Sequence, residues 1–234
     1  MHTPWDFFDK IYCISLAERN DRRQEARVQF QRVGLSRRVD FVIVDKHPTD
    51  CEQGIYESHL HCMRQGLADG AESIMIFEDD VVFDRFSHQC LSDATAFLAS
   101  LPTWHLFFLG CMVKGSRRTV CSHVLQIRYR SLTHAYAVHR DFARQLVPQP
   151  WRGVPYDDFL RDLKDPLSYV VHPAMAFQSA SRSDNLRYLP LDRIRRLLGG
   201  LRNLQKANAF YHRNRWSILA AHGVVLLLTL LAMR

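Results

Sequence analysis

Short apolar blocks and longer amphipathic segments alternate along the first 180 residues and predict strands and helices in turn. Apolar runs of strand length, rich in β-branched and aromatic residues, lie at residues 10–16, 40–44, 73–77, 104–109, 124–129, 135–138 and 168–171. Segments of helical character lie between them at residues 15–33, 58–68, 90–100, 141–146 and 157–163. This alternation, without a recognisable repeat, predicts an α/β fold with a mostly parallel sheet flanked by helices.

The acidic triplet Glu78-Asp79-Asp80 directly follows the apolar run Ser73–Phe77, which has the character of a central strand covered on both faces. Ligand sites in open α/β sheets lie beyond the carboxyl ends of such strands. Three consecutive carboxylates repel one another, and a hard divalent cation such as Mg²⁺ or Mn²⁺ would relieve that repulsion. In an extended segment Glu78 and Asp80 point to one side and Asp79 to the other. The alternative interpretation is a solvated loop that ends the strand.

The charge of the chain is unevenly distributed. Its 234 residues are 47% apolar and 24% charged, which is typical of a globular protein. Residues 1–181 contain 21 Lys and Arg against 22 Asp and Glu, whereas residues 182–215 contain nine basic residues against two acidic ones. The net charge of +7 therefore belongs to the tail. A body without a spread basic surface argues against a nucleic-acid partner.

The six cysteines form no C-x-x-C pair and no zinc-ligand spacing. The first residues also lack the basic and apolar regions of a secretory signal. We therefore expect free thiols in a reducing cytoplasm.

The last part of the chain, Trp216–Met233, contains eighteen residues without a charge. As a helix it would extend roughly 27 Å, close to the ~30 Å hydrocarbon thickness of a bilayer. The basic stretch before it fits the positive-inside rule and attraction to anionic lipid. The pattern predicts a single C-terminal span with the body on the cytoplasmic face of a membrane. A helix that lies in the interface, or one buried in the protein, is the alternative.

Six segments in chain order resemble glycosyltransferase family 25, which contains lipooligosaccharide and procollagen galactosyltransferases. They are IYCISLAERNDRR from Ile11, EQGIYESH from Glu52, IFEDDVVF from Ile76, HAYAV from His134, VPYDDFL from Val154, and Pro173–Gln178 followed by Ser183-Asp184. The resemblance spans residues 10 to about 185 and does not include the tail. One departure is Ile55, where the family has a cysteine.

The resemblance implies a GT-A-type, Rossmann-like sheet with a nucleotide-sugar at the strand ends. It implies that Glu78 and Asp79 lie on the nucleotide side, and that Asp80, with Glu78, binds Mn²⁺ or Mg²⁺ at the diphosphate. Ser15, Arg19 and Arg22 lie just beyond the first strand, where a helix N-terminus favours anions and arginine suits a phosphate. A solvated, charge-rich first turn is the alternative for these residues.

A sugar transfer also needs a general base for the acceptor hydroxyl. Asp157 and Asp158 begin a helix after a Pro-rich loop, and the resemblance favours Asp157 as the base of an inverting displacement. Each aspartate could instead cap the helix and complement its dipole. His172, at a strand end before Pro173, is a third candidate metal ligand or phosphate contact, although a lone histidine is more often structural.

Together these features predict a metal-dependent glycosyltransferase that moves a hexose onto a lipid-linked or lipooligosaccharide glycan. Galactose from UDP-galactose is the donor that the resemblance implies. The expected organisation is a catalytic domain at residues 1–185, a basic linker or amphipathic helix at 186–215, and a membrane helix at 216–233. The alternative is a catalytically inactive protein of the same fold that acts as a membrane-bound interaction protein.

Overall fold

The computed structural model describes residues 3–179 and 200–232. The large sheet contains β1 (Lys10–Leu16), β2 (Asp40–Val44), β3 (Ser73–Glu78), β5 (Leu106–Phe108), β6 (Met112–Arg118), β7 (Val124–Ser131), β8 (Ala135–His139) and β9 (Ser168–Val171). A small second sheet pairs β4 (Val81–Phe83) with β10 (Ala176–Gln178). The helices are η1 (Pro4–Phe7), α1 (Asn20–Arg32), α2 (Cys51–Ala68), α3 (His88–Ser100), α4 (Arg140–Leu146), α5 (Tyr156–Asp162) and α7 (Gly200–Ala232).

The eight strands of the large sheet follow the order β2-β1-β3-β8-β5-β9-β7-β6. Their pairings make β8 and β7 antiparallel to their neighbours, while the other six strands run in one direction. The prediction of an α/β fold with a mostly parallel sheet is therefore confirmed. The carboxyl ends of β1 and β3, which pair in parallel, meet at the same edge.

Helices cover both faces of the sheet because the central strand β3 is apolar on both sides. Met75 and Phe77 point into a core shared with η1, α1 and α3. Ile74 and Ile76 point into a second core shared with α2, α4 and α5. The continuous apolar run that predicted a doubly covered strand thus has the expected place in the structure.

Two predicted helix starts differ from the observed ones. Ser15 does not cap α1; it is the penultimate residue of β1, and its Oγ accepts a hydrogen bond from Arg23 at 3.1 Å. Helix α2 begins at Cys51 because the Asp50 side chain accepts from two backbone amides of the first turn. Ser58 therefore lies inside α2, where its hydroxyl donates to a backbone carbonyl one turn earlier.

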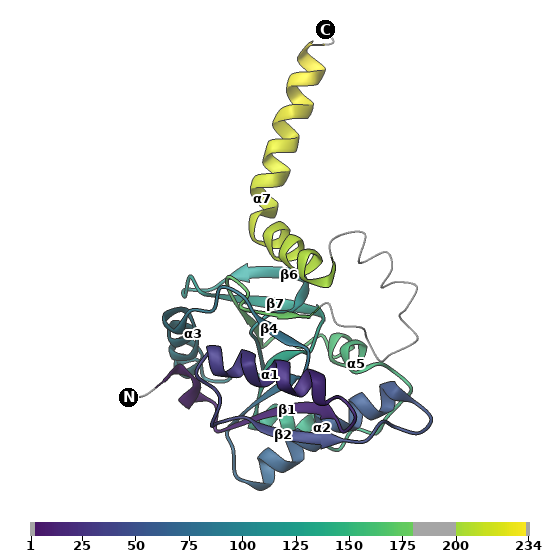
Figure 1. Ribbon diagram of the computed structural model, residues 1–234. Helices are drawn as coiled ribbons and strands as arrows, with labels where there is room; N and C mark the ends of the chain where they lie inside the picture. Colours follow the sequence, from purple (N-terminus) through teal and green to yellow (C-terminus); the bar gives the residue numbers. More distant parts are fainter. Residues whose placement is uncertain (1–2, 180–199, 233–234) are drawn as a thin grey trace.

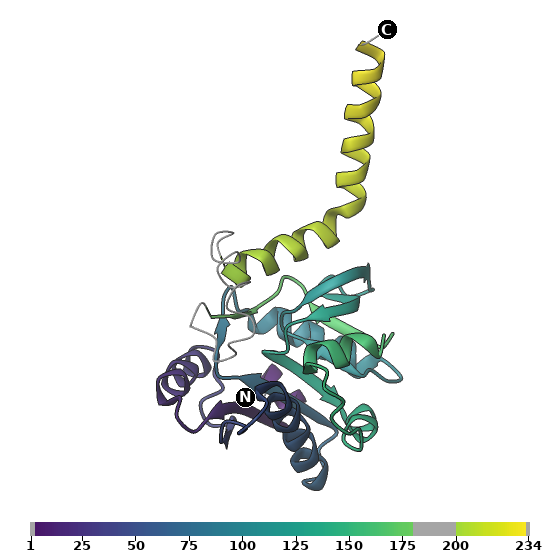
Figure 2. The same ribbon diagram turned by 90° about the vertical axis from the view of Figure 1, so that its right-hand side faces the viewer.

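Helix α7 has two parts with different surroundings. Its first part lies against β6 and β10, and it then bends away from the body, as Figures 1 and 2 show. Gln205 is fully buried and donates from Nε2 to the Ala176 carbonyl at 2.9 Å. Asn208 bonds both the amide and the carbonyl of Val113 on the edge strand β6, at 2.9 and 3.0 Å. Part of the expected linker is therefore docked on the body.

The expected membrane helix stays a prediction. Within the residues that the structure describes, no helix combines the length and the hydropathy that a bilayer span requires. Residues 186–199 of the predicted linker, Ser183-Asp184 and the final two residues lie outside the described ranges.

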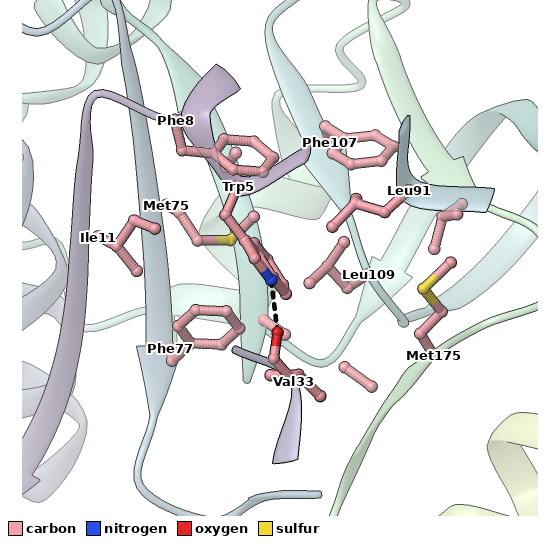
Figure 3. Close-up of a cluster of buried hydrophobic side chains, with 14 of the residues drawn as sticks. Trp5, Phe8, Ile11, Val33, Met75, Phe77, Leu91, Phe107, Leu109 and Met175 are labelled. Carbon is pink, nitrogen blue, oxygen red and sulfur yellow. Dashed lines mark hydrogen bonds between the residues drawn. The ribbon is translucent and has the colours of Figure 1, made fainter. Parts of the chain in front are cut away.

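Trp5 anchors the core between η1, α1 and the sheet (Figure 3). The side chain is fully buried, and its indole Nε1 donates to the Val33 carbonyl at 2.8 Å. The ring stacks on Phe86 and meets Phe77 and Phe83 edge-on. One side chain thereby connects the end of α1, the central strand and the segment that follows β4.

We predict that Trp5→Ala lowers the free energy of unfolding by about 3–5 kcal/mol, because it leaves a cavity and an unpaired carbonyl. Urea denaturation measures the change. The matched control is Trp216→Ala, at a side chain that is 72% exposed, where we expect a change below about 0.5 kcal/mol. Equal effects of the two substitutions would contradict the anchoring role of Trp5.

Candidate functional site

A cavity of about 540 Å³ opens at the carboxyl ends of β1 and β3. Its walls come from these two strands, the start of α2, the segment before β8, the start of α5 and the first residues of α7. The predicted site residues that line it are Ser15, Arg22, Glu78, Asp79, Asp80, Asp157 and Asp158. The fold therefore brings together residues that are up to about 140 positions apart in the chain.

The acidic triplet divides between two environments. Asp79 is buried beside Arg22 of α1, with 3.5 Å between Oδ1 and the guanidinium Nη1. Glu78 accepts a hydrogen bond from the Thr133 hydroxyl at 2.9 Å. Asp80 is held from the other side, because its carbonyl accepts from the Ser179 amide and its carboxyl contacts the Gln178 side chain. Only Asp79, among the three, has a guanidinium ion-pair partner within the described residues.

Burial makes two of the three carboxyls unusually weak acids. Desolvation, followed by the charge of Asp157, raises the pKa of Glu78 to about 7. Desolvation, followed by the charge of Glu78, raises the pKa of Asp80 to about 8. Burial also raises the pKa of Asp79, against the lowering effect of Ser15 and Arg22. In the absence of a bound cation, the pair therefore retains protons at pH values where an exposed carboxyl has lost them.

Ser15 and the arginines of α1 have distinct roles. Ser15 lines the cavity beside Arg22, whereas Arg19 is not among its lining residues and forms a bidentate pair with Asp21. Arg23, which the sequence did not single out as a site residue, donates to Ser15 and to the carbonyls of Leu16 and Ala17. It fixes the turn between β1 and α1 that forms one wall of the cavity.

Asp157 and Asp158 both line the cavity, but their partners differ. Asp157 accepts from the Tyr129 hydroxyl at 2.6 Å and from the Leu132 amide at 3.0 Å. Asp158 pairs with Arg161 one turn along α5. Residues of β7 and the segment after it therefore hold the Asp157 carboxyl, and its charge raises the pKa of Glu78. Asp158 interacts instead with a residue of its own helix.

His172 lies outside the cavity. It lines a separate small cavity beside α7, together with Asn208 and His212. Its imidazole Nε2 is buried without a hydrogen-bond partner, and desolvation followed by the charge of Arg213 lowers its pKa to about 4. The structure does not bring His172 to Glu78 and Asp80, because β9 ends on the far side of β5 and β8 from β3.

A buried aromatic network that the sequence did not predict supports Glu78. His59 stacks on Tyr156 with ring centroids 4.2 Å apart, and its Nδ1 lies 3.1 Å from the Tyr136 hydroxyl. Its Nε2 lies 3.6 Å from Oε1 of Glu78. Desolvation lowers the pKa of His59 to about 3, so the ring is neutral. Serine and histidine in the segment EQGIYESH were the signal, but the sequence could not show that His59 faces the triplet.

The carboxyls fit a cation that the substrate helps to bind. Among the described residues, no group of three or more His, Cys, Asp or Glu side chains is arranged to hold a metal ion. Glu78 and Asp80 nevertheless share one cavity, and Oδ1 of Asp80 is buried with no hydrogen-bond partner. Mg²⁺ and similar ions often take one or two carboxylates and complete their shell with water and substrate phosphates. The donor set suits such an open site.

Comparison with curated proteins finds relatives that are named as glycosyltransferase 25 family members. The chain is 28% identical over 201 residues to a Bos taurus protein named probable inactive glycosyltransferase 25 family member 3, over 71% of this chain and 32% of that protein. It is 28% identical over 198 residues to the Homo sapiens inactive glycosyltransferase 25 family member 3, with the same coverage. The sequence similarity is to glycosyltransferase family 25. The chain spans about a third of the length of these relatives, and no protein-family model matches it.

Comparison with solved structures gives weaker likenesses. A glycosyltransferase involved in the glycosylation of the major capsid of PBCV-1 aligns with a TM-score of 0.45 and 12% identity, over 74% of this chain and 94% of that one. A197 from STIV aligns with a TM-score of 0.44 and 9% identity, over 72% and 83%. TM-scores of this size do not define a shared fold.

The raised pKa values predict how stability depends on pH. Between about pH 4 and pH 8 the folded chain retains protons on Glu78 and Asp80 that the unfolded chain has lost, so the free energy of unfolding falls as pH rises. Asp80→Asn removes one of these groups. In EDTA, we expect this variant to reduce the fall by on the order of 1 kcal/mol per pH unit.

Urea denaturation at a series of pH values measures this slope. The control is Glu57→Gln, at an exposed position of α2 outside the cavity, which should leave the slope unchanged. A wild-type slope in the variant would contradict the buried, protonated state of Asp80.

Proposed function

We propose that the protein is a member of glycosyltransferase family 25 that transfers a hexose from a nucleotide-sugar to a glycan acceptor. The observation that carries the proposal is the pair of half-buried carboxyls, Glu78 and Asp80, which interact electrostatically in a large cavity at the strand ends. Buried carboxyls of this kind are costly to the fold and cluster at functional sites. The sequence relatives are named as members of glycosyltransferase family 25, and the resemblance to that family implies a nucleotide-sugar and a metal ion at such a site.

The donor diphosphate would lie at the ends of β1 and β3. Glu78 and Asp80 would hold Mn²⁺ or Mg²⁺, which as a Lewis acid supplies neutralisation of the charge on the departing diphosphate. Arg22 supplies a fixed positive charge in the same wall, held in place by Asp79. His172 has no part in this arrangement. Family resemblance supports UDP-galactose as the donor and a lipid-linked or lipooligosaccharide glycan as the acceptor.

Asp157 is the general base in this proposal. The acceptor hydroxyl oxygen forms a bond to the anomeric carbon, its proton passes to the Asp157 carboxylate, and the bond to the diphosphate oxygen breaks with inversion. The Tyr129 hydroxyl and the Leu132 amide hold the carboxylate in place. Each of its oxygens accepts one hydrogen bond there and has a further lone pair for the acceptor proton.

Binding without transfer is a second candidate function, because the curated relatives are named inactive. A protein of this type would retain the cavity and use it to bind a nucleotide-sugar or a glycan. The two candidates differ in one measurable property, which is turnover of the donor.

A nucleotide-sugar hydrolysis panel, with and without Mn²⁺, tests the proposal without knowledge of the acceptor. We expect one donor to be hydrolysed in the presence of Mn²⁺, with UDP-galactose as the first candidate, and no hydrolysis in EDTA. Asp80→Asn should abolish the Mn²⁺-dependent reaction because the variant lacks one of two metal-binding carboxylates. Tight donor binding by calorimetry without hydrolysis would favour the non-catalytic alternative, and neither binding nor hydrolysis would refute both.

Asp157→Asn should reduce the rate of transfer or donor hydrolysis by a factor on the order of 10² or more, the usual effect of losing a general base. Donor affinity should change little, because Asp157 is held by Tyr129 and Leu132 and is not one of the predicted metal-binding pair. Steady-state kinetics and calorimetry separate the two properties. The control is Asp162→Asn, at an exposed aspartate of α5 that pairs with Arg161. A larger effect of Asp158→Asn would transfer the role of base to that residue.

A further inference from the structure

Basic side chains gather at the sheet edge where α7 leaves the body. The edge strand β6 and its neighbour β7 form a hairpin that lies beneath the bend of α7 (Figure 1). Their exposed basic residues and those at the bend form a group that we call the basic edge. It consists of Lys114, Arg117, Arg118, Arg128, Arg130, Arg213 and Arg215.

Contacts between α7 and the hairpin bring the basic residues at the bend close to those of the hairpin. Asn208 bonds the backbone of Val113, and the Ser116 hydroxyl donates to the His212 carbonyl at 3.2 Å, so α7 follows β6 along its length. Burial lowers the pKa of His212, and the charges of Arg215, Arg128 and Arg130 lower it further. Residues of α7 and β7 therefore add their positive charge at the same place.

Several arginines elsewhere in the body are neutralised by carboxylates. Arg38, Arg140 and Arg161 each form an ion pair with a neighbouring carboxylate. Within the described ranges, no side chain of the basic edge forms an ion pair. Lys114 is close enough to lower the pKa of Asp162, which is itself paired with Arg161. Apart from that interaction, carboxylates among the described residues do little to offset the repulsion among these cations.

Directly beyond the basic edge, α7 presents apolar side chains to solvent. The ring of Trp216 is 72% exposed and carries the Arg215 guanidinium over its face at 5.2 Å. Leu219 and Val225 are 53% and 63% exposed. In Figures 1 and 2 this part of the helix projects away from the rest of the body that the structure describes. A folded basic surface therefore lies next to an unpartnered apolar helix with a tryptophan at the junction.

We propose that the basic edge and the projecting part of α7 together form a docking surface for an anionic lipid bilayer. An anionic bilayer attracts basic side chains to its surface and takes up apolar side chains in its interior. Tryptophan prefers the interface between the lipid headgroups and the hydrocarbon. A symmetric second copy would instead place one basic edge against another, which like-charge repulsion opposes. The inference concerns the folded sheet edge as well as the tail, and it does not depend on the proposed transfer reaction.

Vesicle co-sedimentation of the full chain tests this surface. We expect binding to vesicles of phosphatidylcholine mixed with phosphatidylglycerol, and weaker binding to phosphatidylcholine alone. The variant Arg117→Glu/Arg118→Glu/Arg130→Glu should lower the partition coefficient on mixed vesicles roughly 100-fold. Trp216→Ser/Leu219→Ser should also lower it, without any change of charge. Circular dichroism checks that the variants, all at exposed positions, remain folded.

The matched control is Arg32→Glu/Arg37→Glu/Arg64→Glu, which makes the same change of charge at exposed positions on and near α1 and on α2. It should retain most of the binding. Equal losses in the two triple variants would show that only net charge matters and would overturn the assignment to the basic edge. Failure of the wild-type chain to bind mixed vesicles would overturn it as well. Self-association in sedimentation velocity that Trp216→Ser/Leu219→Ser abolishes, without lipid binding, would assign the helix to a second copy instead.

Discussion

Glu78 and Asp80 are two carboxyls that share one cavity at the end of a buried strand, where the loss of solvent makes the charged form of each unfavourable. Burial raises the pKa of both, and the charge of Glu78 contributes to the shift of Asp80. Burying two carboxyls close together opposes folding, so a rigid framework is needed to hold them in place. The central position of β3, between β1 and β8 and covered on both faces, provides that rigidity. The organisation of the site follows from this constraint.

The three carboxyls of the triplet have different neighbours, and only Asp79 among them has an arginine partner within the described residues. Arg22 forms its ion pair with Asp79, and its charge only partly offsets the raised pKa values of Glu78 and Asp80. Thr133 donates to Glu78, and the His59 ring beside it is kept neutral by desolvation. A protonated His59 would pair with Glu78 and lower its affinity for a cation. The neutral ring, stacked on Tyr156, leaves the negative charge of Glu78 for a ligand.

Sequence patterns predicted the parts of the molecule that local interactions determine. The strand at residues 73–77 and the acidic triplet after it have the expected places, since a continuous apolar run and a strand end are local features. Edge strand β6 was missed because its polar sequence, MVKGSRR, resembles a loop; backbone pairing with β7 and Asn208 of α7 makes it a strand. His172 was placed in the metal shell because the sequence shows the end of a strand, not which strands lie beside it.

Helix α7 contacts both the cavity and the sheet edge, and its contact with β10 is tightly packed. Gly200 and Leu201 line the cavity, and Gln205 of the same helix bonds the Ala176 carbonyl on β10. A Cβ atom on Gly110 would lie 2.0 Å from that carbonyl oxygen, so only glycine permits the approach. Strand β10 continues to Gln178, whose side chain contacts the Asp80 carboxyl. A continuous set of contacts therefore runs from the docked part of α7 through β10 to the Asp80 carboxyl.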